Sequence, residues 1–166
     1  MADTTSRLAL PLLQAGQAQK ELYHNEALAL LDLTVAAAVE SVGLDSPPAS
    51  PTFGQCWIIG DAPTGDWSGH ANALAGWTEG GWRFVTPRAG LSAWSTADAV
   101  FCRFDGIRWA VGDVPIRRLT AGGVQVVGSQ QPGIESPTGG TVVDPEARTA
   151  IAAILAALRR HGLIAS

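Results

Sequence analysis

The sequence predicts an α+β protein with an N-terminal helix, a small tryptophan-rich antiparallel β-domain (a sheet or a partial barrel), an extended arm and a C-terminal helix. Three observations support this class. Apolar residues recur at helical spacing near both ends, short strand-like runs alternate with glycine turns in the middle, and a stretch without apolar periodicity follows them. The four predicted segments are 1–45, 46–115, 116–143 and 144–166.

The composition is that of a globular protein and excludes several classes. The chain has 166 residues, of which 46% are hydrophobic and 16% charged, and its net charge is -4. With a single lysine, Lys20, it has no basic surface for phosphates, so we expect no nucleic-acid partner. No apolar run reaches the roughly 18 residues of a membrane span, and the first residues lack a signal-peptide pattern. We therefore expect synthesis in the cytoplasm and no membrane insertion.

Segment 1–45 predicts a docked arm followed by a helix. Residues 8–13 are apolar but contain Pro11, which disrupts a helix interior and favours an extended arm. From about Gln17 to Ser41 we expect a helix that Gly43 stops, with Asn25 as a break or cap within it. Its apolar residues recur at spacings of three and four: Leu28, Leu31, Val35, Ala38 and Val42.

Segment 46–115 predicts a small antiparallel sheet. It opens with the proline-rich run 46–52, which marks a boundary. Glycine turns at 79–81 and 105–106 are typical of tight hairpins, because glycine readily adopts a positive φ. The predicted strands are 55–59, 74–78, 82–86, 92–94, 100–104 and 108–111. Two cysteines, Cys56 and Cys102, lie in these runs without CxxC spacing, which favours buried reduced thiols over a disulfide or metal site.

The last two segments predict an extended arm and a strongly punctuated helix. Residues 112–143 are rich in Gly, Pro, Gln, Ser and Thr, with one strand candidate at 124–127. Asp144 then provides an N-cap, Pro145 the first helical position and Gly162 the stop. The apolar stripe of this helix cannot be buried by the helix alone: Ile151, Ile154, Leu155 and Leu158. This helix packs either on its own domain or on the same helix of other copies in a homo-oligomer, and the sequence does not favour one alternative over the other.

No catalytic or metal-binding pattern is apparent. His24, His70 and His161 form no HExxH or HxH motif, and neither GxSxG nor a phosphate-binding glycine loop occurs. Acidic residues could in principle converge for glycoside hydrolysis, although turn formation accounts for all of them: Asp61, Asp66, Glu79, Asp98 and Asp105. We therefore predict no enzyme activity, no metal and no cofactor.

The tryptophans are the most informative residues. All six lie between positions 57 and 109. A small sheet can use large rings to fill its core, and exposed indole faces can instead stack on sugar rings. Trp57, Trp82 and Trp109 fit alternating strand patterns and are expected in the core. Trp67 lies in a turn-rich run and is the best candidate for exposure, so we select Trp67, His70 and Asn72 as candidate glycan-binding residues.

Two long blocks carry a family resemblance. LPLLQAGQAQKELYHNEALALLD (10–32) and SPPASPTFGQCWIIGDAPTGDWSGHANALAGWTEGGWRFVTPRAGLSAW (46–94) resemble the DUF2793 family of phage-like particles and prophage tail or spike proteins, over about residues 8–110. The C-terminal helix also resembles that of members from gene transfer agents, particles that carry host DNA between cells. The resemblance implies a virion component, namely a head-spike or tail-fibre base or adaptor for attachment to the host surface.

This interpretation has consequences for partners and location. The expected partners are copies of the chain in a trimer or pentamer, other capsid or tail proteins, and host capsular or surface polysaccharide. The expected location is the extracellular particle after synthesis in the cytoplasm. Because the sequence stops at Ser166 without a large C-terminal module, an adaptor or spike base is favoured over a complete fibre. The first alternative is a free-standing carbohydrate-binding module. The second, which the sequence favours less, is a polysaccharide-degrading enzyme.

Overall fold

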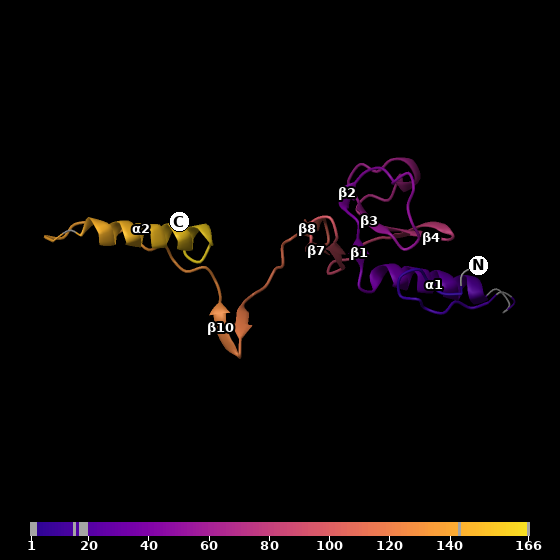
Figure 1. Cartoon of the computed structure of the whole chain (residues 1–166), viewed down its shortest axis with the longest axis horizontal. Helices are drawn as coiled ribbons and strands as arrows, with labels where there is room; N and C mark the ends of the chain where they lie inside the picture. The colour runs from indigo at the N-terminus through magenta and orange to yellow at the C-terminus, as the bar shows by residue number, and fades with distance from the viewer. Residues whose placement is uncertain (1–2, 15, 17–19, 143, 166) are drawn as a thin grey trace. The chain divides into compact units, whose positions relative to one another are not determined.

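The computed structural model describes residues 3–14, 16, 20–142 and 144–165, and these residues have the predicted α+β architecture (Figure 1). Its sheets are open, and no barrel closes among the described residues. The chain divides into two units, Met1–Val114 and Pro115–Ser166. The predicted segment 1–45 therefore belongs to the same unit as the β-domain.

One sheet of the first unit has the strand order β2-β3-β4-β5. β2 runs parallel to β3, whereas β3, β4 and β5 are antiparallel neighbours. Thr78 pairs with Gly81 across the turn at Glu79 and Gly80, which confirms the predicted hairpin. The strands are β2 (Val42–Leu44), β3 (Cys56–Ile59), β4 (Leu74–Thr78) and β5 (Gly81–Val85).

The second sheet of this unit has the order β1-β6-β7-β8, in which β1 runs parallel to β6 and the other neighbours are antiparallel. Residues 38–44 contribute an edge strand to each sheet, so this short segment connects the two. The backbone N–H of Glu40, between the two edge strands, donates to the carbonyl of Cys56 at 2.8 Å. The strands are β1 (Ala38–Val39), β6 (Ser92–Ser95), β7 (Val100–Phe104) and β8 (Trp109–Val111).

Helix α1 (Lys20–Thr34) is shorter than predicted, and the predicted apolar stripe is wrong. The backbone of Ala36 adopts a positive φ of 49°, so the chain leaves the helical conformation there. Beyond it, β-branched residues favour strands that can pair with the two sheets. Gly43 forms a bulge in β2 instead of a helix stop, with a φ of 81°. The predicted stripe is split by these changes: Leu31 and Val35 are half exposed, and Ala38 and Val42 lie in strands.

The helix instead buries Asp32 and Leu33, and Asp32 holds the predicted docked arm. The Asp32 carboxylate accepts hydrogen bonds from the Thr5 hydroxyl (2.7 Å) and from the backbone N–H groups of Arg7 (3.0 Å) and Leu8 (2.7 Å). Asn25 neither breaks nor caps the helix, because its side-chain amide pairs with the backbone of Leu13 in the arm.

The first sheet is buried on both of its faces, because consecutive strand residues point in opposite directions. All four residues of β3 are buried. One face packs with α1 and the second sheet around Leu33, Cys56, Ile58, Leu74 and Cys102. Leu33 lies so close to Gly76 that a Cβ added there would overlap the Leu33 side chain. The other face carries an aromatic core: Trp57, Trp67, Trp77, Trp82 and Phe84.

The second unit contains β9 (Leu119–Ala121), β10 (Val124–Val127) and α2 (Pro145–Arg160). Part of the predicted arm is therefore a hairpin, in which all residues of β9 and β10 are exposed. The predicted caps of α2 are confirmed. The Asp144 carboxylate accepts from the backbone N–H of Ala147 at 2.8 Å, and Gly162 ends the helix with a φ of 68°.

Candidate functional site

A groove with a volume of about 480 Å³ lies in the first unit between the arm, α1 and the β4–β5 hairpin. This volume falls in the range of ligand-binding pockets, and such pockets usually combine apolar walls with a few polar groups. Apolar residues of all three elements line it, namely Leu12, Leu13, Leu22, Ala29 and Trp77, although the Trp77 ring itself packs in the aromatic core on the other face of the sheet. Its charged residues are Glu21, Glu26, Asp32, Glu79 and Arg83.

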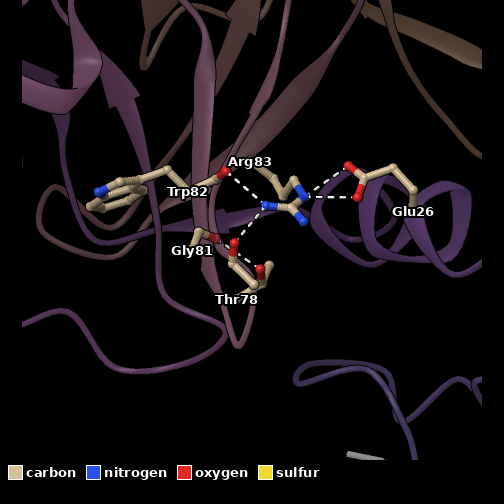
Figure 2. Close-up of polar contacts among 6 residues, drawn as sticks. Glu26, Thr78, Gly81, Trp82 and Arg83 are labelled. Carbon is tan, nitrogen blue, oxygen red and sulfur yellow. Dashed lines mark hydrogen bonds and ion pairs between the residues drawn. The ribbon is translucent and has the colours of Figure 1, made fainter. Parts of the chain in front are cut away.

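An ion pair joins the two sides of this groove (Figure 2). The Nε of Arg83 on β5 lies 2.8 Å from Oε1 and 2.9 Å from Oε2 of Glu26 on α1. The same guanidinium donates through Nη1 to the carbonyls of Gly80 (3.0 Å) and Trp82 (3.1 Å). The pair connects the β4–β5 hairpin to α1. Because both charged side chains are partly exposed, it contributes at most about 1 kcal/mol to stability.

The expectation that Trp67 is exposed is wrong. Its side chain is 0% exposed, because the short 3-10 helix η1 (Gly65–Trp67) inserts it into the aromatic core. Its ring lies 6.2 Å from that of Trp57 and 5.2 Å from that of Trp82, both between ring centroids. Edge-to-face and tilted geometries of this kind favour packing of aromatic rings. In this arrangement the indole face of Trp67 cannot stack on a sugar.

His70 and Asn72 lie in the same loop, and other residues of the first unit engage both. The His70 ring stacks on Phe84, with centroids 3.7 Å apart and planes at 10°. The Asn72 side chain donates to the Asp61 carboxylate at 2.9 Å, while its carbonyl accepts from Nε1 of Trp109 at 2.9 Å. These contacts give both residues a structural role, which the turn-rich sequence did not reveal.

An exposed aromatic pair lies elsewhere in this unit. Trp94 on β6 is directly opposite Phe101 on β7, and their centroids are 5.0 Å apart. Trp94 is 38% exposed and Phe101 58%. On β6 the structure buries Ala93 and Ser95 and exposes Trp94, the reverse of what the hydrophobicity of Trp94 and Ser95 predicts. Sequence reasoning missed this pair because it examined loops for exposed rings.

The apolar stripe of α2 is only partly covered within its own unit. Leu155 is 5% exposed and Leu158 is partly buried, whereas Ile151 and Ile154 are 42% and 58% exposed. The segment before the helix pairs with the residues that follow it, where Gln131 forms backbone hydrogen bonds with Leu163 and Ala165. Leu155 and Ile164 are the buried apolar side chains among the described residues of this unit.

Both cysteines are buried free thiols, as predicted. Burial is the main cause that raises the pKa of each thiol. A hydrogen bond from Arg7 partly opposes this for Cys56, and the nearby Asp98 carboxylate adds to it for Cys102. A raised pKa means less thiolate, so neither group is an activated nucleophile.

Within the ranges that the structure describes, no three His, Cys, Asp or Glu side chains gather as a metal site requires. None of the described helices is long and apolar enough to cross a membrane.

Fold and site together define an α+β protein with two four-stranded open sheets, a separate β-hairpin, an aromatic core and an amphipathic terminal helix. Residues 24–110 match the profile of the family described as "Protein of unknown function (DUF2793)". The chain therefore belongs to the DUF2793 family. Among curated proteins, no significant match is found.

Proposed function

We propose that this protein is a structural subunit of a symmetric assembly, in which α2 and the segments around it associate with the same elements of other copies. The observation that carries this proposal is the exposure of Ile151 and Ile154 on a helix whose unit buries only two apolar side chains, Leu155 and Ile164, among its described residues. Ordering a chain segment costs about 1–2 kcal/mol per residue in backbone entropy, which burial must offset. Partner copies would provide that burial.

The assembly that fits best is a phage-like particle, such as a gene transfer agent or prophage particle. The support is the resemblance of the two sequence blocks to spike and tail proteins of such particles. In this proposal the chain is a trimeric or pentameric base or adaptor that contacts other capsid or tail proteins. It serves attachment to the host surface and carries out no reaction.

Light scattering on the purified chain tests the association. We expect a mass that is a multiple of 17.2 kDa and that falls to the single-chain value in Ile154→Glu, because a buried charge at the stripe is costly. Ala153→Glu adds the same charge away from the stripe and should leave the mass unchanged. A wild-type monomer at high concentration would contradict the proposal.

A second candidate function, polysaccharide binding, is favoured by one observation. Trp94 and Phe101 present adjacent ring surfaces on the second sheet, and aromatic faces stack on sugar rings. This pair replaces Trp67 as the proposed stacking surface. Binding to host capsule by wild type, its loss in Trp94→Ala and its retention in Phe53→Ala, an exposed aromatic residue at another position, would support the idea. Equal binding by all three proteins would contradict it.

A further inference from the structure

The groove between the arm, α1 and the β4–β5 hairpin has no role in the self-association proposed above. Its walls keep apolar surface in contact with solvent, most clearly at Leu22, which is 66% exposed. A groove of about 480 Å³ with such walls is large enough for one or two side chains of another molecule. Apolar walls alone do not say which side chains these are.

The charges of the groove restrict the choice. Four carboxylates and one guanidinium line it, and that guanidinium, Arg83, is already held by Glu26 and by backbone carbonyls. Asp32 is occupied by its three donors from the arm. The groove therefore has an excess of negative charge, and an anionic ligand would meet repulsion.

Glu21 adds a specific reason to expect a cation. One of its oxygens accepts from the backbone N–H of Gly16 at 3.4 Å, whereas Oε2 is buried and has no partner among the described residues. Burying a carboxylate oxygen without a partner is unfavourable, and a nearby cation or hydrogen-bond donor offsets that cost. Lysine and arginine combine such a group with an apolar stem.

We propose that this groove binds a segment of a partner polypeptide that presents a lysine or arginine side chain next to an apolar residue. The stem and the apolar neighbour pack against the walls formed by Leu13, Leu22 and Ala29, and the Glu21 side chain turns its unpartnered oxygen toward the cationic head. The complementarity of charge and of apolar surface selects this partner over an acidic or purely apolar one.

The test measures binding of three fluorescent peptides by anisotropy, using the full chain. The peptides are acetyl-Leu-Lys-Leu-Lys-amide and its counterparts with glutamine or glutamate in place of lysine. We expect the lysine peptide to bind about tenfold more tightly than the glutamine peptide, and the glutamate peptide to bind least. Equal affinity for the lysine and glutamine peptides would overturn the proposal.

Variants then locate the site. Glu21→Gln keeps the shape of the side chain, and it should reduce the preference for lysine to near parity. Ala29→Trp fills the groove and should weaken binding of the lysine peptide at least about tenfold. Glu40→Gln, which removes a carboxylate outside the groove, should bind like wild type. If Glu21→Gln retains the full lysine preference in a chain with wild-type thermal unfolding, the proposal is wrong.

We expect peptide binding by the groove to be independent of the self-association. The Ile154→Glu variant, which we expect to be monomeric, should bind the lysine peptide with the affinity of the wild-type groove. Loss of peptide binding in that variant together with loss of the oligomer would also overturn the proposal, because the groove would then depend on neighbouring copies.

Discussion

The two units of this chain use apolar residues in opposite ways. Met1–Val114 buries large side chains on both faces of a sheet, including Trp57, Trp67 and Ile58. Pro115–Ser166 buries only Leu155 and Ile164 among its described apolar residues, and the valines of its hairpin are exposed. The first unit has the core of an independent domain, whereas the second leaves most of its described apolar side chains exposed to solvent.

This difference teaches that secondary structure and self-sufficiency are separate properties. α2 has the more complete local signals, with a carboxylate N-cap, proline at its start and a glycine stop. α1 lacks several of these features, yet Asp32 and Leu33 anchor it to the arm and the sheet. Local signals predict where a helix forms, and buried contacts decide whether it stays folded without partners.

The largest expected effect is the loss of a ring from the aromatic core. Trp67→Ala should lower the free energy of unfolding of the first unit by about 3–5 kcal/mol, because it leaves a large cavity between Trp57 and Trp82. Trp94→Ala, a matched change at a partly exposed site, should cost less than about 1 kcal/mol. Urea unfolding followed by far-UV circular dichroism checks both. Equal losses would contradict the assignment of the core.

The next effect concerns the arm. Asp32→Ala removes the acceptor of three hydrogen bonds and should cost about 2–3 kcal/mol, because two backbone N–H groups and a hydroxyl lose their partner. Limited proteolysis should then cut within residues 3–13 before the rest of the first unit. Asp66→Ala, at an exposed position in η1, should leave the proteolysis pattern unchanged. Protection of the arm in Asp32→Ala would show that other contacts hold it.

A smaller effect is expected where α1 meets the sheet. Gly76→Ala should destabilise the first unit by about 1–3 kcal/mol, because the new Cβ would overlap the Leu33 side chain. The cost should shrink in a Leu33→Ala background, where the overlap disappears. A double-mutant cycle by thermal unfolding measures this coupling, and simple additivity would contradict direct packing of Leu33 on Gly76.

In the second unit the matching change is at the N-cap of α2. Asp144→Ala should destabilise the helix by about 1 kcal/mol, since the N–H of Ala147 loses its acceptor. Asp144→Asn retains an acceptor and should cost much less. Hydrogen exchange of the first turn of α2 reports the difference, and the first unit should show none. Faster hydrogen exchange in the first unit of Asp144→Ala would show that the stability of the two units is coupled, contrary to this account.

The smallest effect is a pH dependence of the β7–β8 turn. The N–H groups of Arg108 and Ile107 lower the pKa of Asp105 by hydrogen bonding to its carboxylate. The ionised form is thus favoured in the folded turn. The stabilisation of the turn by the ionised Asp105 carboxylate is complete above the ordinary aspartate pKa. It is lost as the pH falls from that value through the lowered pKa of the folded state. NMR titration should detect this in the turn amides, and Asp105→Asn should remove it.

Much of this fold could be predicted from the sequence. The strands of both sheets alternate or carry glycine turns at their ends, and α2 carries its caps within the local sequence. Residues 35–41 were predicted as helix because alanine and valine at these positions satisfy a helical spacing. Residues 38–44 contribute strands instead, because β1 pairs with β6 and β2 pairs with β3. Pairing with strands elsewhere in the chain cannot be recognised from the local sequence of the segment.

The candidate site was less predictable. Trp67 lies in a sequence of turn residues, and only its insertion among distant rings makes it a core residue. The groove joins residues from the arm, α1 and the β4–β5 hairpin, so no motif in one segment could indicate it. Strand alternation puts Trp94 and Ser95 on opposite faces of β6, but the sequence does not indicate that the serine is the buried one.

Hydrogen exchange of the wild-type chain over a range of concentrations tests the central claim most directly, because it reports both units in one sample. The account predicts that protection of the α2 amides, around Ile151 and Ile154, falls on dilution while that of β3 and β4 stays constant. Protection of α2 that is high and independent of concentration, in a chain of monomeric mass, would contradict it.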